Sequence, residues 1–153
     1  NVRALGFAMG ERIAAAFGTE AINIANATPA DFQADLLILG SSTWGVGELQ
    51  DDWQAGLAML ESADLNGKKV ALFGLGDQSG FGDTYCDAIG ILANAAKSKG
   101  AQIVGETSAD GYSCSASAAI EDGRFCGLAL DDNNEPDKTD ARIAAWVEQL
   151  KNA

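Results

Sequence analysis

The sequence predicts an α/β fold: a three-layer sandwich in which helices cover both faces of a parallel sheet. Two apolar runs, 36–39 and 69–73, are bounded by polar residues and glycines, as expected of strands buried on both faces. Helical patterns alternate with these runs, and such alternation is typical of a parallel sheet. Each run leads into a glycine-rich loop. Because ligands of open α/β sheets bind at the carboxyl ends of the strands, these two loops form the candidate site.

Length and composition narrow the possible functions. The 153 residues fit a single domain over 1–153, and 22 acids against 10 bases give a net charge of −12. Such a surface repels nucleic acid and anionic membranes and favours basic protein surfaces. With no histidine, imidazole metal sites and histidine-based catalytic triads are excluded.

The cysteines and the hydropathy pattern bear on the compartment. Three cysteines cannot all pair, and their spacing fits no metal site: Cys86, Cys114 and Cys126. No apolar stretch approaches the ~20 residues that span a bilayer. The N-terminus lacks the basic and apolar pattern of a secretory signal, so a cytoplasmic location is expected.

The start of the chain allows two interpretations. Residues 2–9 can form a short first strand, followed by Gly10 and a helix over 11–17. The connection would then be a single glycine, shorter than the roughly 2 to 6 residues common in such units. Alternatively, residues 4–17 form one helix and the first strand is absent.

The next elements follow from turn residues and periodicity. Residues 21–25 predict a second strand, and Thr28 before Pro29 predicts the N-cap of a short helical turn. The run 36–39, the most apolar in the chain, is expected to be a central strand. A helix over 51–60 follows, and spacings of four and three indicate one buried face: Trp53, Leu57 and Leu60.

The second half of the chain predicts one interrupted strand between two helices. A helix over 83–99 follows the second glycine-rich loop. Residues 102–105 begin a fifth strand, a polar excursion over 107–123 interrupts it, and an apolar run over 125–130 resumes it.

The last helix is expected over 139–152. Thr139 is its expected N-cap, and its apolar residues share one face: Ile143, Trp146, Val147 and Leu150.

Each glycine-rich loop carries one large aromatic residue, Trp44 in the first and Phe81 in the second. A lone loop tryptophan more often packs on its own domain, but a second aromatic on the adjacent loop favours ligand stacking. Rings about 7 Å apart would sandwich a planar heterocycle, each stack contributing about 0.5–1.5 kcal/mol beyond burial. Asp77 and Gln78 offer acceptors and donors to the edge of a pyrimidine-like ring, with loop closure as the alternative. Residues 131–134 could bind a polyol, although a polar turn is favoured.

Three motifs resemble those of long-chain flavodoxins: GSSTWGVGELQDDW (40–53), ALFGLGDQSGFGDTYCDAIG (71–90) and DGYSCSASAAIEDGRFCGLALDDNNEPDKTDARIAAWVEQLK (110–151). The resemblance covers nearly everything from Glu11 onward, and the excursion over 107–123 corresponds to the insertion that divides the fifth strand of long-chain members. It implies a five-stranded parallel sheet of order 2-1-3-4-5 and non-covalently bound FMN. It further implies low-potential one-electron transfer between redox proteins, without an enzymatic activity of its own.

The resemblance also assigns site residues. Trp44 matches the residue that stacks on one flavin face, and Phe81 stands where most members have a tyrosine on the other face. The remaining matches are Thr43, Gly45, Val46 and Gly47 in the first isoalloxazine loop, Gly76, Asp77 and Gln78 in the second, and Asn133 near the ribityl chain. Acidic residues around the flavin would dock basic patches on partners such as flavodoxin or ferredoxin reductase and low-potential oxidoreductases, with the carrier acting as a monomer.

One feature departs from the family. Flavodoxins bind the FMN phosphate with a Thr-x-Thr-Gly-x-Thr type loop before the first helix, and this chain has none. Compared with the family, roughly ten residues are missing between Gly10 and Glu11. Either the chain as given lacks residues that the protein has, which we favour, or the phosphate anchor is truly absent. The second case leaves a competing hypothesis, a flavodoxin-fold binding module without FMN. An NAD-dependent enzyme is disfavoured, because no G-x-G-x-x-G follows the first strand.

Overall fold

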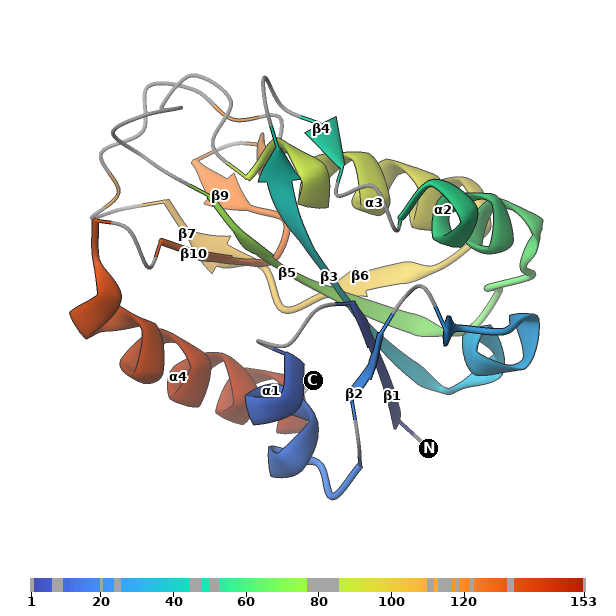
Figure 1. The fold of residues 1–153 in the computed structure, drawn as a ribbon, viewed down its shortest axis with the longest axis horizontal. Helices are drawn as coiled ribbons and strands as arrows, with labels where there is room; N and C mark the ends of the chain where they lie inside the picture. Colours follow the sequence, from blue (N-terminus) through green and yellow to red (C-terminus); the bar gives the residue numbers. More distant parts are fainter. Residues whose placement is uncertain are drawn as a thin grey trace.

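A central parallel sheet organises the computed structural model, which describes residues 2–6, 10–19, 21–23, 26–44, 48–49, 53–76, 86–109, 112, 117, 119–121, 123–131 and 134–152. The sheet has the order β10-β5-β3-β1-β2 (Figure 1). Its strands are β1 (Val2–Gly6), β2 (Ala21–Asn23), β3 (Leu36–Trp44), β5 (Lys69–Leu75) and β10 (Leu128–Leu130). The expected order 2-1-3-4-5 is therefore confirmed, with β3 in the middle as its apolar run predicts.

The fifth strand is divided, as the sequence predicts. β6 (Gln102–Val104) pairs with β5 from Lys69 to Ala71, and β10 pairs with the same strand from Phe73 to Leu75. Between them a small antiparallel sheet has the order β7-β9-β8. Its strands are β7 (Thr107–Ser108), β8 (Ile120–Glu121) and β9 (Arg124–Phe125).

The expected start of the resumed strand at residue 125 is wrong. Phe125 belongs to β9, and the parallel strand restarts only at Leu128. Gly127 marks the crossing point, where an added Cβ would lie 2.1 Å from the carbonyl oxygen of Leu72. Only a residue without a side chain can pass this close to the β5 backbone.

The N-terminal segment forms a strand and a helix. β1 pairs in parallel with both β2 and β3, so the alternative of one helix over 4–17 is wrong. Helix α1 (Gly10–Ala16) includes Gly10, so the expected single-glycine connection is also wrong. Residues 7–9 lie between the two elements, outside the described part of the chain.

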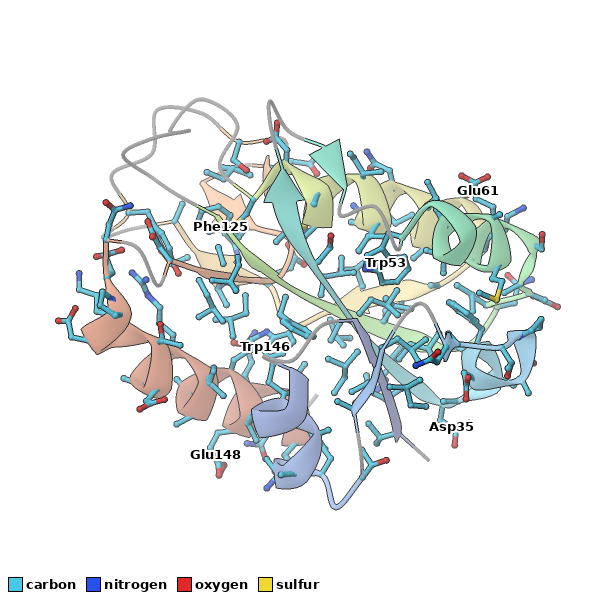
Figure 2. The ribbon with its side chains drawn as sticks, viewed as in Figure 1. Asp35, Trp53, Glu61, Phe125, Trp146 and Glu148 are labelled. Carbon is cyan, nitrogen blue, oxygen red and sulfur yellow. The ribbon has the colours of Figure 1, made fainter. Side chains whose placement is uncertain are left out.

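Helices cover both faces of the sheet (Figure 1). Helices α2 (Trp53–Ser62) and α3 (Asp87–Ser98) lie on one face, and α1 and α4 (Thr139–Lys151) on the other. The expected apolar faces are confirmed, because Trp53 and Leu60 belong to one core cluster and Ile143 and Trp146 to the other. Figure 2 shows Trp53 and Trp146 on opposite sides of the sheet. No described helix is long and apolar enough to cross a bilayer.

The helix starts test two predicted caps. Thr28 caps the short helix η2 (Pro29–Gln33), and its backbone N–H donates to the Asp31 carboxylate at 2.9 Å, as predicted. Thr139 is not an N-cap. A short helix, η3 (Pro136–Lys138), runs directly into α4, so Thr139 is already helical and is buried.

Candidate functional site

The carboxyl ends of three neighbouring strands meet at one edge of the sheet. β3 and β5 stay paired as far as Ser42 and Leu75, and β10 pairs with β5 as far as Leu130. Beyond the last pair, the N–H of Gly76 donates to the carbonyl oxygen of Leu130 at 3.0 Å. The chain therefore leaves the sheet at Trp44, Gly76 and Asp131 side by side, and the two loops start from neighbouring strands as predicted. The expected end of the first strand at residue 39 is wrong, because residues 40–44, assigned to the first loop, belong to β3.

A short strand of the first loop pairs with the end of β3. β4 (Glu48–Leu49) pairs antiparallel with the end of β3, and its Leu49 and Glu48 oppose Thr43 and Trp44. Residues 45–47, between Trp44 and Glu48, are outside the described part of the chain. The pairing with β4 keeps Trp44 at the tip of the central strand.

Small residues pack the strand ends closely. Gly40 of β3 is opposite Phe73 of β5, and the next pair is Ser41 and Gly74. A Cβ at Gly40 would lie 2.1 Å from Cζ of Phe73, and one at Gly74 would lie 2.8 Å from Cγ2 of Ile89. Neither position can carry a larger residue without moving its neighbours, so the backbone at this edge is fixed by packing.

A buried indole holds the same stretch of β3. The Nε1–H of Trp53 donates to the carbonyl oxygen of Gly40 at 2.8 Å, and Trp53 is fully buried. The sequence placed Trp53 on an apolar helix face but gave no sign of this hydrogen bond, because its partner lies on another element. Trp146 makes the equivalent bond on the other face, donating to the carbonyl oxygen of Gly105 at 2.7 Å.

Hydrogen bonds join the described residues of the segment after β10, which are Asp131, Asn134 and Glu135. The fully buried carboxylate of Asp131 accepts hydrogen bonds from the backbone N–H of Asn134 at 2.9 Å and from its side-chain amide at 2.8 Å. The N–H of Glu135 donates to the carbonyl oxygen of Asp131 at 2.9 Å. These bonds favour the turn over the polyol site for the described part of this segment.

The structure describes only some of the predicted site residues. It places the backbones of Thr43 and Trp44 at the end of β3 and Gly76 at the end of β5. The others lie outside the described residues: Gly45, Val46, Gly47, Asp77, Gln78, Phe81 and Asn133. The aromatic sandwich of Trp44 and Phe81 therefore stays a prediction. Within the described residues, no group of three potential metal ligands is present.

The carboxyl ends of neighbouring parallel strands are where an open α/β sheet can hold a planar ring with polar edges. Neighbouring parallel strands lie about 4.8 Å apart, so loops that start from β3 and β5 can close on a flat group from two sides. Each non-proline residue of such a loop carries one backbone N–H donor and one C=O acceptor, which can meet the rim of a heterocycle. An isoalloxazine ring has this combination of flat faces and polar rim.

Comparisons with known proteins agree on one family. The chain matches the family model described as Flavodoxin over residues 1–146. It is 47% identical over 146 residues to a flavodoxin of Synechococcus elongatus, which spans 92% of this chain and 86% of that protein. It is also 47% identical over 122 residues to flavodoxin 2 of Escherichia coli K12, covering 78% of this chain and 70% of that protein.

Solved structures give the same result. A crystal structure of Fusobacterium nucleatum flavodoxin bound to flavin mononucleotide is similar with a TM-score of 0.89 and 34% identity, covering 99% of this chain and 95% of that one. Oxidised flavodoxin 1 of Bacillus cereus shares the fold, with a TM-score of 0.68 and 24% identity, covering 99% and 97% of the two chains.

Proposed function

Because the chain belongs to the flavodoxin family, it is an FMN-dependent one-electron carrier and not an enzyme. We propose which of its residues hold the flavin and what kind of surface its partner proteins present. FMN supplies a ring that takes up and releases electrons one at a time. The protein's part is to bind this ring, orient it and set the energy of its redox states. Each ~1.4 kcal/mol by which the site disfavours one redox state shifts a one-electron potential by about 59 mV.

The proposed flavin site is the edge where β3, β5 and β10 end. The hydrogen bond from Gly76 to Leu130 is the observation that carries this proposal, because it joins the ends of β5 and β10 just beyond their last strand pair. Thr43 to Gly47 would flank the ring on one side, with the Trp44 indole on its face. The other side would be formed by Gly76, Asp77, Gln78 and Phe81, with Asn133 near the ribityl chain.

The charge of the protein affects how easily the bound flavin accepts its second and final electron. An aromatic sandwich in a protein of net charge −12 disfavours an extra negative charge on the ring. We therefore propose a low-potential carrier, in which the last reduction step is the difficult one.

The partners are redox proteins, and we propose that they present basic surfaces. Acids exceed bases by 12, and exposed acids such as Glu61 and Glu148 lie on described helices (Figure 2). Such a charge speeds encounter with a basic patch and makes association fall with ionic strength. A monomer in the cytoplasm is part of the same proposal, and the odd number of cysteines, three, fits a reducing compartment.

The competing hypothesis is a flavodoxin-fold module without FMN. The missing phosphate motif is the observation behind it. Family membership and the FMN-bound flavodoxin of similar structure disfavour it.

Titration of FMN with the purified protein tests the proposal. Binding should quench flavin fluorescence, and Trp44→Ala should weaken binding by roughly ten-fold or more and raise the potential of the last reduction step. Phe17→Ala is the matched control, because this half-buried aromatic residue follows α1 and should leave affinity unchanged. Wild-type protein that leaves FMN fluorescence unchanged would refute the carrier function. Riboflavin in the same assay measures what the phosphate contributes, and the intact mass shows whether the chain is complete near Gly10.

A further inference from the structure

Tyr112, a residue of the excursion that divides the fifth strand, is anchored to β10. Its hydroxyl donates to the carbonyl oxygen of Ala129 at 2.7 Å. Its ring packs edge-on against Phe125, with 4.8 Å between the centroids. The excursion thus contacts β10 at Ala129, one residue before that strand ends at Leu130.

Arg142 of α4 joins this tyrosine to the turn after β10. Its guanidinium lies over the Tyr112 ring, 4.2 Å from the centroid, and its Nη2 contacts Oε1 of Glu135 at 3.1 Å. Both side chains of this ion pair are withdrawn from water, with 16% and 17% of their surface exposed. Such a pair is screened far less than an exposed one.

Glu135 closes the turn from its other end. Its N–H donates to the carbonyl oxygen of Asp131, whose carboxylate holds Asn134 through two hydrogen bonds. The contacts therefore run without a break from Tyr112 through Arg142 and Glu135 to the turn. Gly76, the start of the second glycine-rich loop, bonds to Leu130 immediately before that turn.

One feature of Arg142 argues against a role in stability alone. Its Nη1 is buried and finds no hydrogen-bond partner in the part of the chain that the structure describes. A buried charged donor without a partner costs stability, and such exceptions call for another explanation. The explanation that we favour is that Arg142 holds Glu135 and Tyr112 in one geometry.

We propose that Arg142 is a positioning residue for FMN: by clamping Glu135 to Tyr112 it fixes Asp131, Asn134 and Glu135 near Gly76, from which the second glycine-rich loop starts. The excursion in the fifth strand then contributes to flavin binding through Tyr112. This inference rests on the proposed function, since it places the flavin at that edge of the sheet.

A matched pair of variants separates positioning from charge. Lys138 contacts the same Glu135 carboxylate at 2.6 Å, but half of its side chain is exposed. Arg142→Met and Lys138→Met each remove one positive charge beside Glu135, so they change the net charge of the protein by the same amount. FMN dissociation constants are measured by fluorescence quenching on each folded protein, which leaves differences in global stability out of the comparison.

We expect Arg142→Met to weaken FMN binding about ten-fold or more and Lys138→Met to change it less than about three-fold. Tyr112→Leu should weaken binding as well, and the double variant Tyr112→Leu/Arg142→Met should lose less than the product of the two single losses. Equal affinities of the Arg142→Met and Lys138→Met proteins would overturn the proposal. Arg142→Lys, which keeps the charge but lacks the planar fork, should bind FMN more weakly than wild type and replaces the methionine variant if that protein does not fold.

Amide hydrogen exchange of the FMN-free protein gives a second readout. Protection at Asn134 and Glu135 should fall in the Arg142 variants and persist in Lys138→Met. Unchanged protection in both would also overturn the proposal. If wild type does not bind FMN, the proposed function fails, whereas the exchange data still decide whether Arg142 fixes the turn.

Discussion

Replacing Gly40 by alanine should destabilise the protein, because the added methyl group overlaps a buried ring. The new Cβ would lie 2.1 Å from Cζ of Phe73 and 2.3 and 2.4 Å from its two Cε atoms, where carbon atoms normally keep about 3.5–4 Å. Phe73 cannot swing into solvent, since it is 1% exposed and packs edge-on against Trp146 with 6.3 Å between centroids. Overpacking of this kind costs about 1–3 kcal/mol. A loss of about 2 kcal/mol in a domain of this size lowers Tm by about 4 to 8 °C.

A double-mutant cycle tests the cause as well as the size of the effect. Phe73→Leu removes the overlapping ring atoms, at a cost of its own of about 1–2 kcal/mol. The double variant Gly40→Ala/Phe73→Leu should then lose about 0.5–3 kcal/mol less than the sum of the two single losses. Urea unfolding of the FMN-free proteins, followed by circular dichroism, gives the unfolding free energies of wild type and the three variants, and hence the three losses. Additive losses, or a Gly40→Ala protein within about 0.5 kcal/mol of wild type, would refute the reasoning.

Three further predictions concern a buried hydrogen bond, a tightly packed glycine and a buried thiol. Trp53→Phe leaves the Gly40 carbonyl without its indole donor and should cost about 1–3 kcal/mol in urea unfolding, so an unchanged midpoint would count against that bond. Gly105→Ala should cost at least about 1 kcal/mol, because Gly105 has φ +80° and its Cβ would lie 2.7 Å from Nε1 of Trp146; a wild-type Tm would contradict this. Burial raises the pKa of the Cys126 thiol from 9.0 to about 11, so iodoacetamide should modify it slowly at pH 8, and rapid modification by mass spectrometry would contradict the burial. Because that pKa is higher in the folded state, its contribution to stability is complete below pH 9 and is lost as the pH rises through about 11.

The sequence predicted the elements that depend on local patterns. The spacing of Ile143, Trp146 and Leu150 predicted the buried face of α4, and the apolar run 36–39 predicted the central strand. These predictions succeed because one element carries the whole signal. The restart of the fifth strand at Leu128 depends instead on how closely Gly127 passes the Leu72 carbonyl, which no local pattern reveals.

The sequence predicted where the site lies but not the hydrogen bonds and packing contacts that hold it. The sequence predicted that the loops after β3 and β5 are neighbours, and the strand register confirms it. It gave no sign of the indole bonds to Gly40 and Gly105, whose partners are 13 and 41 residues apart. The sequence did not single out Arg142 either, because an arginine on an amphipathic helix is normally expected to be solvated. Only the structure shows that its guanidinium lies over the Tyr112 ring.

The contacts that fix the strand ends are mostly between uncharged groups. The structure of the site therefore depends little on the charged residues of the surface. Trp53 and Phe73 hold β3 through an indole bond and packing, and Tyr112 holds β10 through its hydroxyl. The exposed acids, such as Glu61 and Glu148, take no part in these contacts. Substituting an exposed acid should therefore change the unfolding free energy by less than about 0.5 kcal/mol while still altering the rate of encounter with a basic partner. A carrier built in this way can adjust its surface to different redox partners without disturbing the edge of the sheet where the flavin is proposed to bind.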